Sequence, residues 1–156
     1  MSYSGSQAFA PIGSKLQIQI YNQASPPVLT FTDVAELQNI QRSGSKSDLV
    51  DVTNHQSTGG YREFLATLRD AGDVTFAGNY IPNDLTQQAL QTLFDGATLV
   101  ACKIVLPPAG TFTVSLGSWA FNAYVMSNDY DLPHDKEGKI SGKLKITGKP
   151  VFTPGS

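Results

Sequence analysis

The sequence predicts a mainly β protein: a β-sandwich or barrel of about seven to eight strands with one flanking α-helix. Three observations support this prediction. Short segments of alternating apolar and polar residues recur along the chain, clusters of Gly and Pro separate them, and a single segment has apolar residues at helical spacing. The length of 156 residues suits one domain with a substantial buried core.

The alternating segments divide the chain into successive strands. In residues 15–20, Leu16, Ile18 and Ile20 face one way, while Gln17 and Gln19 face the other. Further strands are expected within residues 28–40 and over 49–53, 74–80, 98–107, 111–116, 119–126 and 139–148.

The ends of the chain and one internal segment lack this alternation. Residues 1–14 are small and polar, and we interpret them as a flexible N-terminal arm. A single domain is expected over residues 15–150, followed by a C-terminal tail at 151–156. The polar segment 127–138 is expected to be a loop.

One helix is predicted after the Pro-Asn-Asp sequence that ends at Asp84. Asp84 is a candidate N-cap, and Gln87 lies three residues further on, as in a capping box. Gly96 lies where a left-handed C-cap residue would fall. The apolar residues at helical spacing are Leu85, Ala89, Leu90, Leu93 and Phe94.

Composition excludes several classes of protein. Charged residues make up only 15% of the chain, against about 25% in an average soluble domain. The net charge of −2 argues against binding of nucleic acid through its phosphates. No apolar run approaches the length of a membrane helix, and the N-terminus lacks the pattern of a secretory signal. We therefore expect no membrane association and synthesis in a cytoplasm.

Residues with catalytic or metal-binding chemistry do not form a recognisable motif. His55 and His134 both lie in polar segments, and Cys102 is the only cysteine, within an apolar strand where it is expected to be buried. Residues 43–48 lack the spacing of a phosphate-binding loop, and no Gly-x-Ser-x-Gly elbow is present. The sequence therefore predicts no catalytic residue, cofactor or metal site, and a protein that is not an enzyme.

Two further clusters allow a binding function. Trp119, Phe121 and Tyr124 could stack on a sugar, although Trp119 and Phe121 share a strand face and are expected in the core. The acidic residues of the 127–138 segment lack the Gly and the closing Glu of a calcium loop, so a solvated loop is favoured. These acidic residues are Asp129, Asp131, Asp135 and Glu137.

Residues 51–84 resemble the signature region of the major tail tube proteins of long-tailed bacteriophages. In that family an Asp-x-Thr strand end leads into a Ser/Thr- and Gly-containing loop, a Tyr-Arg-Glu-Phe turn, an Asp-Gly-Gly-like turn and a Val-x-Phe-x-Gly strand. The similarity extends from Lys15 to Pro150 through the segments 103–107, 121–127 and 143–150. The matching positions are Asp51, Thr53, Ser57, Gly60, Tyr61 to Phe64, Leu68, Asp70 to Gly72, Val74, Phe76 and Gly78.

The resemblance implies a tail-tube-like fold and a structural function in the virion tail. Subunits of this family self-assemble into hexameric rings that stack into a hollow tube, through which DNA is ejected into the host. The implied partners are other copies of the chain, a tape measure protein inside the tube, and a tail-tip initiator and a tail terminator at its ends. DNA would pass without specific binding, which suits a neutral or acidic bore. Synthesis would occur in the host bacterial cytoplasm.

In the family, a long loop between two early strands docks on the next ring. We therefore predict that residues 54–72 form an inter-ring stacking loop. Tyr61, Phe64 and Leu68 would be its apolar anchors, since aromatic residues are enriched in interface hot spots. The alternative is that these three residues pack beneath their own domain, with residues 70–72 forming only a turn. The charges expected to orient the loop are Arg62, Glu63, Arg69 and Asp70.

Two other functions remain open at this point. One is the inner tube of a contractile injection or secretion system, which would share the fold. The other is a β-sandwich carbohydrate-binding module with Trp119 and Tyr124 as stacking groups. Glycan binding by a monomer that never assembles would favour the module.

Overall fold

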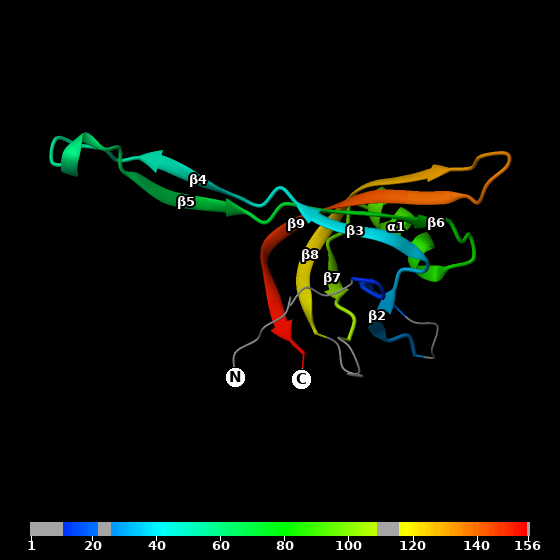
Figure 1. The fold of residues 1–156 in the computed structure, drawn as a ribbon. Coiled ribbons are helices and arrows are strands. Elements are labelled where there is room, and N and C mark those ends of the chain that lie inside the picture. The colour runs from blue at the N-terminus through cyan, green and yellow to red at the C-terminus, as the bar shows by residue number, and fades with distance from the viewer. Residues whose placement is uncertain (1–10, 22–25, 109–115, 156) are drawn as a thin grey trace, which may run out of the picture.

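The computed structural model describes residues 11–21, 26–108 and 116–155 of the chain. Seven antiparallel strands form one sheet in the order β2-β1-β7-β8-β9-β6-β3, while β4 and β5 form a separate hairpin (Figure 1). The strands are β1 (Lys15–Tyr21), β2 (Leu29–Asp33), β3 (Leu37–Ser43), β4 (Lys46–Asp51), β5 (Phe64–Asp70), β6 (Asp73–Asn79), β7 (Val100–Val105), β8 (Gly117–Asp131) and β9 (Lys139–Pro154). A short 3₁₀-helix η1 (Thr58–Gly60) and the helix α1 (Leu85–Asp95) complete the described elements. The predicted mainly β fold with a flanking helix is confirmed.

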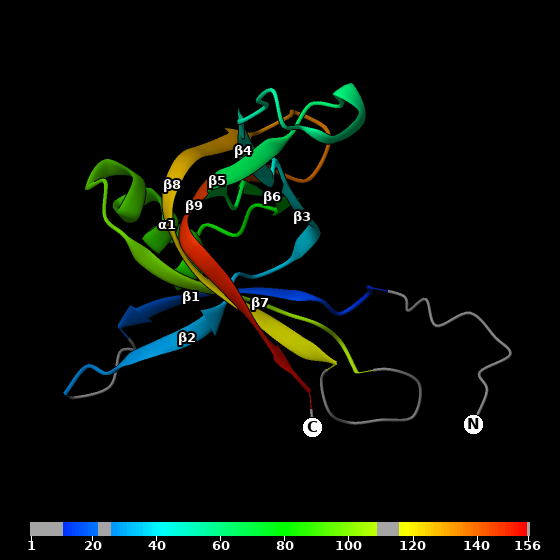
Figure 2. The ribbon, with the colours of Figure 1, turned by 90° about the vertical axis from the view of Figure 1, so that its left-hand side faces the viewer.

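The long strands β8 and β9 bend the sheet. β7 pairs with residues 118–123 of β8, whereas β6 pairs with residues 139–145 of β9, opposite the far end of β8. The β8–β9 register shifts twice, between Ala120 and Asn122 and between Val125 and Ser127. Such bulges increase the local bend and twist, so the single sheet curves around its own core (Figure 2).

The core lies on the inner side of this curved sheet. Phe76 is 2% exposed and faces Gly142 across the β6–β9 pair, where a Cβ atom would lie 2.6 Å from the Phe76 ring. Gly142 therefore makes room for the ring. The buried apolar residues come from β1, β6, β7, β8, β9, α1 and the turn after β2: Leu16, Ile18, Val34, Val74, Phe76, Leu90, Val100, Cys102, Phe121, Ala123, Val125, Ile140, Leu144 and Ile146.

Helix α1 begins as predicted but ends differently. The Asp84 side chain accepts a hydrogen bond from the backbone N–H of Gln87 at 3.1 Å, which confirms the N-cap. The Gln87 side chain does not close a capping box; its Oε1 accepts from the N–H of Ile81 at 2.8 Å. Gly96 has a right-handed backbone, with φ −86°, and Ala97 takes the left-handed conformation instead, with φ 48°. The predicted left-handed C-cap at Gly96 is therefore wrong by one residue.

The Gln87 side chain joins three parts of the chain. Its Nε2 donates to the carbonyl oxygen of Ala35 at 3.1 Å and to that of Asn79 at 3.0 Å. Gln87 is only 1% exposed, and these bonds satisfy the polar atoms that the fold buries. The helix start, the β2–β3 turn and the end of β6 are thus held together by one side chain.

Several predicted boundaries differ from the structure. Residues 127–131 extend β8 and pair with residues 139–143 of β9, so the predicted 127–138 loop shortens to residues 132–138. Polar residues can extend the strands there because one face of an antiparallel pair tolerates water. β9 continues to Pro154, so the expected domain end at residue 150 falls inside a strand. Residues 1–10 of the predicted N-terminal arm, and most of the predicted strand 111–116, lie outside the described residues.

Candidate functional site

A β-hairpin projects from the body of the molecule. We define this projecting hairpin as residues 46–70, comprising β4, the tip with η1, and β5. It extends away from the curved sheet on the side opposite the loop between β8 and β9 (Figure 1). Every residue of β4 is exposed, as is every residue of β5 before Asp70. The hairpin is thus built from its own two strands, with little cover from the body.

The sequence prediction located this feature but described it as a loop. A loop over residues 54–72 was expected, whereas the structure has a paired hairpin that begins at Lys46. Tyr61 and Arg62 lie between η1 and β5, while Phe64 and Leu68 lie on β5. Tyr61 is 79% exposed and Leu68 77%, so neither packs beneath its own domain. A role for these residues in docking stays a prediction.

Apolar side chains lie on both faces of the hairpin. Val50 is opposite Leu65, and Asp51 is opposite Phe64; Leu49, two residues before Asp51, shares the Phe64 face. The four apolar residues are each between 49% and 61% exposed. An isolated two-stranded hairpin is at best marginally stable in water, so this surface is suited to be covered by other chains on both sides. Sequence reasoning missed Leu49, Val50 and Leu65; the signal was two adjacent apolar residues on each of two facing strands.

The tip of the hairpin holds its own shape through polar contacts. The Glu63 carboxylate accepts a hydrogen bond from Ser57 Oγ at 3.0 Å, and the Glu63 N–H donates to Thr53 Oγ1 at 2.8 Å. The Thr53 hydroxyl and N–H both donate to Asp51, and these bonds lower the pKa of the Asp51 carboxyl. Glu63, predicted as an orienting charge, is therefore engaged inside the tip.

The base of the hairpin is fixed to β9 by charges. Lys145 Nζ lies 2.8 Å from Asp70 Oδ1 and 3.4 Å from Asp73 Oδ1. The bond from Lys145, followed by that from the Gly72 N–H, lowers the pKa of Asp70, and Asp70 in turn raises the pKa of Lys145. Asp70 was predicted to orient docking on a neighbour. The structure gives it a partner within the same chain, and its role in docking stays a prediction.

Two glycines allow the hairpin to leave the body. Gly44 follows β3, and Gly72 precedes β6; a Cβ on Gly44 would lie 3.6 Å from the Gly72 Cα. Gly72 has φ +89°, and a Cβ there would overlap the carbonyl oxygen of Ser43. Only glycine suits this backbone conformation and this close passage. The two strands of the hairpin therefore exit the body side by side.

The other candidate sites do not assemble. Cys102 is 1% exposed, and burial raises the pKa of its thiol to about 12, so it is no nucleophile. The Trp119 ring contacts Phe152 at a centroid distance of 5.1 Å and lies 5.3 Å from the Arg42 guanidinium carbon, whereas Tyr124 alternates outward on the same strand. Trp119 and Tyr124 thus form no common sugar platform.

Within the described ranges, no three His, Cys, Asp or Glu side chains are grouped so that they could hold a metal ion. No helix in the described part of the chain has the length and apolar character needed to cross a membrane.

The bent sheet, the flanking helix and the projecting hairpin together define a β scaffold with an exposed apolar extension, and comparison with known proteins identifies its family. The family model described as phage tail tube protein matches residues 12–152. The chain therefore belongs to the phage tail tube protein family, as the resemblance of its motifs predicted. Membership makes it a structural subunit of a virion tail tube. No curated protein sequence matches the chain.

Solved structures with the same fold come from several tail-like assemblies. The tail of an empty gene transfer agent particle, determined with C6 symmetry, contains a chain with a TM-score of 0.66 at 23% identity, covering 89% of this chain and 94% of that one. The anti-feeding prophage baseplate gives 0.67 at 9% identity, with 99% and 98% coverage. The SPP1 tail tube gives 0.63 at 15% identity, with 90% and 76% coverage. At these identities the likeness shows the fold.

Proposed function

We propose that this chain polymerises into stacked hexameric rings, with the projecting hairpin of each subunit crossing to the next ring. The observation that carries this proposal is the apolar surface on both faces of the hairpin. Leu49 and Phe64 on one face, and Val50 and Leu65 on the other, are about half exposed in the single chain. Burial removes roughly 25 cal/mol of unfavourable free energy for each Å² of apolar surface. Neighbouring subunits on both sides of the hairpin would supply that burial.

Ring closure would use the free edges of the sheet. β2 and β3 are the two edge strands of the sheet. After Thr147, β9 is paired with β8 on one side, and no described strand pairs with its other side. Unpaired edges template pairing with another chain, and a head-to-tail contact that closes by rotation gives a ring. The sixfold symmetry of the gene transfer agent tail supports six subunits per ring.

The bore of the stacked rings would conduct DNA. A chain with a net charge of −2 has little excess cation to hold phosphates, so the duplex would slide rather than bind. Before DNA leaves, the bore would contain a tape measure protein, and initiator and terminator proteins would close the two ends. The subunit would be made in the host bacterial cytoplasm and would act without catalysis.

A contractile system is the second candidate. The likeness to the anti-feeding prophage baseplate protein extends over 99% of this chain, and a sheath–tube complex of an extracellular contractile injection system gives a TM-score of 0.59. In such a system the same rings would form an inner tube inside a sheath. Co-sedimentation of assembled tubes with a sheath protein from the same genome would favour this candidate.

Negative-stain electron microscopy of the concentrated protein tests the proposal. Tubes or stacked rings with a central bore are expected, and averaged end views should show sixfold symmetry. A tube subunit can stay monomeric until an initiator starts polymerisation, so a second sample is seeded with fragments of assembled tails. Dispersed single particles in both samples would refute self-assembly, and rings of another symmetry would refute the hexamer alone.

A further inference from the structure

A cationic groove lies at the base of the projecting hairpin. Its volume is about 770 Å³, and it opens between the end of β3, both strands of the hairpin and β9. The apolar residues of its lining are Ala71, Trp119 and Pro150, and we call them the apolar floor. Four cationic side chains surround this floor: Arg42, Lys46, Arg69 and Lys149.

These cations have few counter-ions in the described part of the chain: Lys46 lies opposite Asp70 on the hairpin and helps to lower the pKa of that carboxyl, after the larger contributions of Lys145 and the Gly72 N–H. No ion pair joins Lys46, Arg69 or Lys149 to a described carboxylate, and all three residues are exposed. Arg42 donates to neutral oxygens, and its guanidinium carbon lies 5.3 Å from the centre of the Trp119 ring. The one acidic lining residue, Asp70, is neutralised by Lys145 at 2.8 Å. The groove therefore presents net positive charge around an apolar floor.

The opposite end of the molecule carries the complementary charge. Asp129 and Asp131 at the end of β8, and Asp135 in the following loop, are exposed and form no ion pair with a described residue. Leu132 lies between them in the chain and is 69% exposed. Of the remaining charges, Glu137 is paired with Lys139 at 2.9 Å, and Lys136 adds one positive charge.

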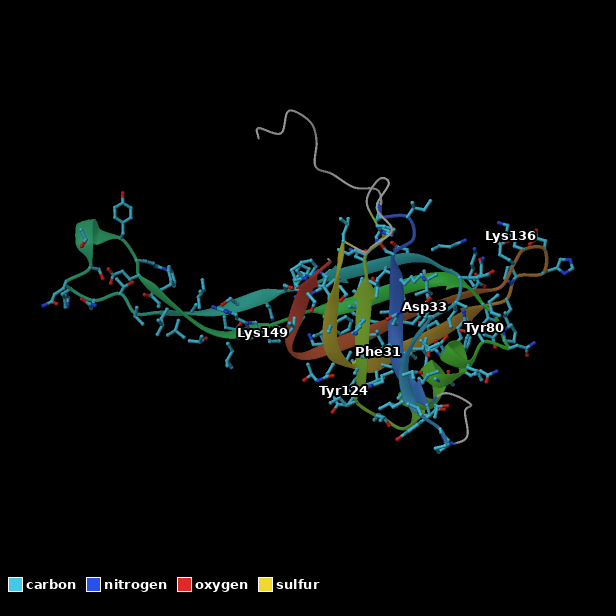
Figure 3. All side chains as sticks on the ribbon, turned by 90° about the horizontal axis from the view of Figure 1, so that it is seen from below. Phe31, Asp33, Tyr80, Tyr124, Lys136 and Lys149 are labelled. Atoms are coloured by element: carbon cyan, nitrogen blue, oxygen red, sulfur yellow. The ribbon has the colours of Figure 1, made fainter. Side chains whose placement is uncertain are left out.

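The groove and the acidic residues lie at opposite ends of the body, along the long axis of the molecule. Figure 3 shows Lys136 at the tip of the β8–β9 loop and Lys149 beside the base of the projecting hairpin, at opposite ends of the body. A second copy placed further along this axis in the same orientation would bring its loop toward the groove of the first. Such translation is the relation between subunits in an open head-to-tail stack.

We propose that the acidic end of the β8–β9 hairpin of one subunit, residues 129–137, docks in the cationic groove of the subunit in the adjacent ring. Asp131 and Asp135 meet Arg69 and Lys149, and Leu132 packs on the apolar floor of the groove. A second copy suits this groove better than free DNA does. DNA phosphates would use only the cationic side chains, whereas a second copy also brings Leu132, which can cover the apolar floor. The contact rests on the proposed stacking of rings and fixes its register.

Charge reversal tests the contact. Like charges placed face to face repel each other, so the loop variant Asp131→Lys/Asp135→Lys and the groove variant Arg69→Glu/Lys149→Glu should each raise the subunit concentration needed for tubes at least about tenfold. The chain with all four changes should return to within about threefold of the wild type. Lys136→Glu is the matched control; it makes the same loop more acidic and should leave assembly unchanged or tighter. The contact would be overturned if the fourfold variant were not rescued, or if the loop variant or the groove variant assembled normally.

Cross-linking provides a measurement that does not depend on altered assembly. Lys149→Cys and Asp135→Cys are combined in one chain, with the buried Cys102 left in place, and a short bis-maleimide is added to preformed tubes. A ladder of multimers on denaturing gels is expected, and each chain with only one of the two introduced cysteines is a control. Tubes without a ladder overturn this contact and leave the tube itself intact. Failure of the wild-type chain to form tubes, even when seeded, overturns the proposed function as well.

Discussion

The start of helix α1 and the projecting hairpin place their side chains in opposite environments. At the helix start, Thr86 and Gln87 are 0% and 1% exposed, and both are polar. Their hydrogen-bonding atoms reach backbone groups of β2, β6 and the turns beside them. On the hairpin, by contrast, apolar side chains such as Leu49 and Leu65 stand more than half exposed.

This difference separates what one chain completes from what several chains must complete. The helix start satisfies its buried polar groups within the chain, so the stability that it supplies is a property of the subunit. The hairpin leaves apolar surface on two faces, so covering it is a property of the assembly. Mutations in the two regions should therefore have separable consequences, one for folding and the other for polymerisation.

The largest effect is expected from removing apolar surface on both hairpin faces. Phe64→Ser combined with Leu65→Ser should raise the subunit concentration needed for tubes about a hundredfold or more, since interface anchors are typically worth 2 kcal/mol or more each. Circular dichroism and the free energy of unfolding should change little, because both residues are exposed. Ala66→Ser is the control, because Ala66 follows Leu65 on the same strand and its small side chain offers little apolar surface. Normal assembly of the double variant would exclude the hairpin as an interface.

The reverse result is expected at Gln87. Gln87→Ala leaves the carbonyl oxygens of Ala35 and Asn79 and the N–H of Ile81 without their partner, and each such buried group costs about 1–3 kcal/mol. The free energy of unfolding should fall by about 3 kcal/mol in urea titrations. Gln88→Ala is the control, since the Gln88 side chain is exposed and donates to the carbonyl oxygen of Pro82. Equal losses in the two variants would contradict the bridging role of Gln87.

Much of the body could be predicted from the sequence because its signals are local. Strict alternation predicted residues 15–20 as a strand, and β1 spans Lys15–Tyr21. Asp84 was predicted as an N-cap from its position before a helical pattern. The acceptors of the Gln87 side chain lie 8 and 52 residues away in the chain, and no local pattern indicates such distant partners.

The hairpin was predicted less completely for a physical reason. A strand was predicted over residues 49–53, which overlaps the end of β4, but a loop was expected where β5 lies. Apolar residues lie on both faces of the hairpin, so the alternation that identifies a half-buried strand is absent from β5. The similarity of Tyr61 to Phe64 to a family motif located the segment, but the pairing that adds Leu49 and Val50 depends on register. The engagement of Asp70 by Lys145 depends on the β6–β9 register, which places Lys145 opposite Asp73, and sequence spacing does not reveal it.

A smaller effect is expected where the hairpin leaves the body. Gly72→Ala adds a Cβ that would overlap the carbonyl oxygen of Ser43, at a backbone angle of φ +89°. We expect a loss of about 2–3 kcal/mol of stability, or faster hydrogen exchange of the β5 and β6 amides near the base. Gly60→Ala is the control, because φ there is +76° but nothing lies within 4 Å of the added Cβ, so only the strain of about 1 kcal/mol remains. Equal effects at the two glycines would mean that the contact of Gly72 with Ser43 and Gly44 leaves room for a Cβ atom.

The smallest effect concerns pH and the ion pair that fixes the hairpin base. The Lys145 ammonium, with the Gly72 N–H, lowers the pKa of Asp70 below its ordinary value of 3.8, so the pair stabilises the folded chain above that pH and is lost as pH falls through the lower folded value. Because Asp70 raises the pKa of Lys145 above 10.5, the pair persists at neutral pH and weakens only in strong alkali. Asp70→Asn should therefore unfold at lower urea concentration than the wild type near pH 7, and the difference should shrink toward zero near pH 2.

The control is Asp48→Asn, which changes an exposed carboxylate of the same hairpin that has no ion pair to a described residue. A wild-type advantage over Asp70→Asn that persisted undiminished in acid would show that this carboxylate holds the hairpin by shape rather than by charge.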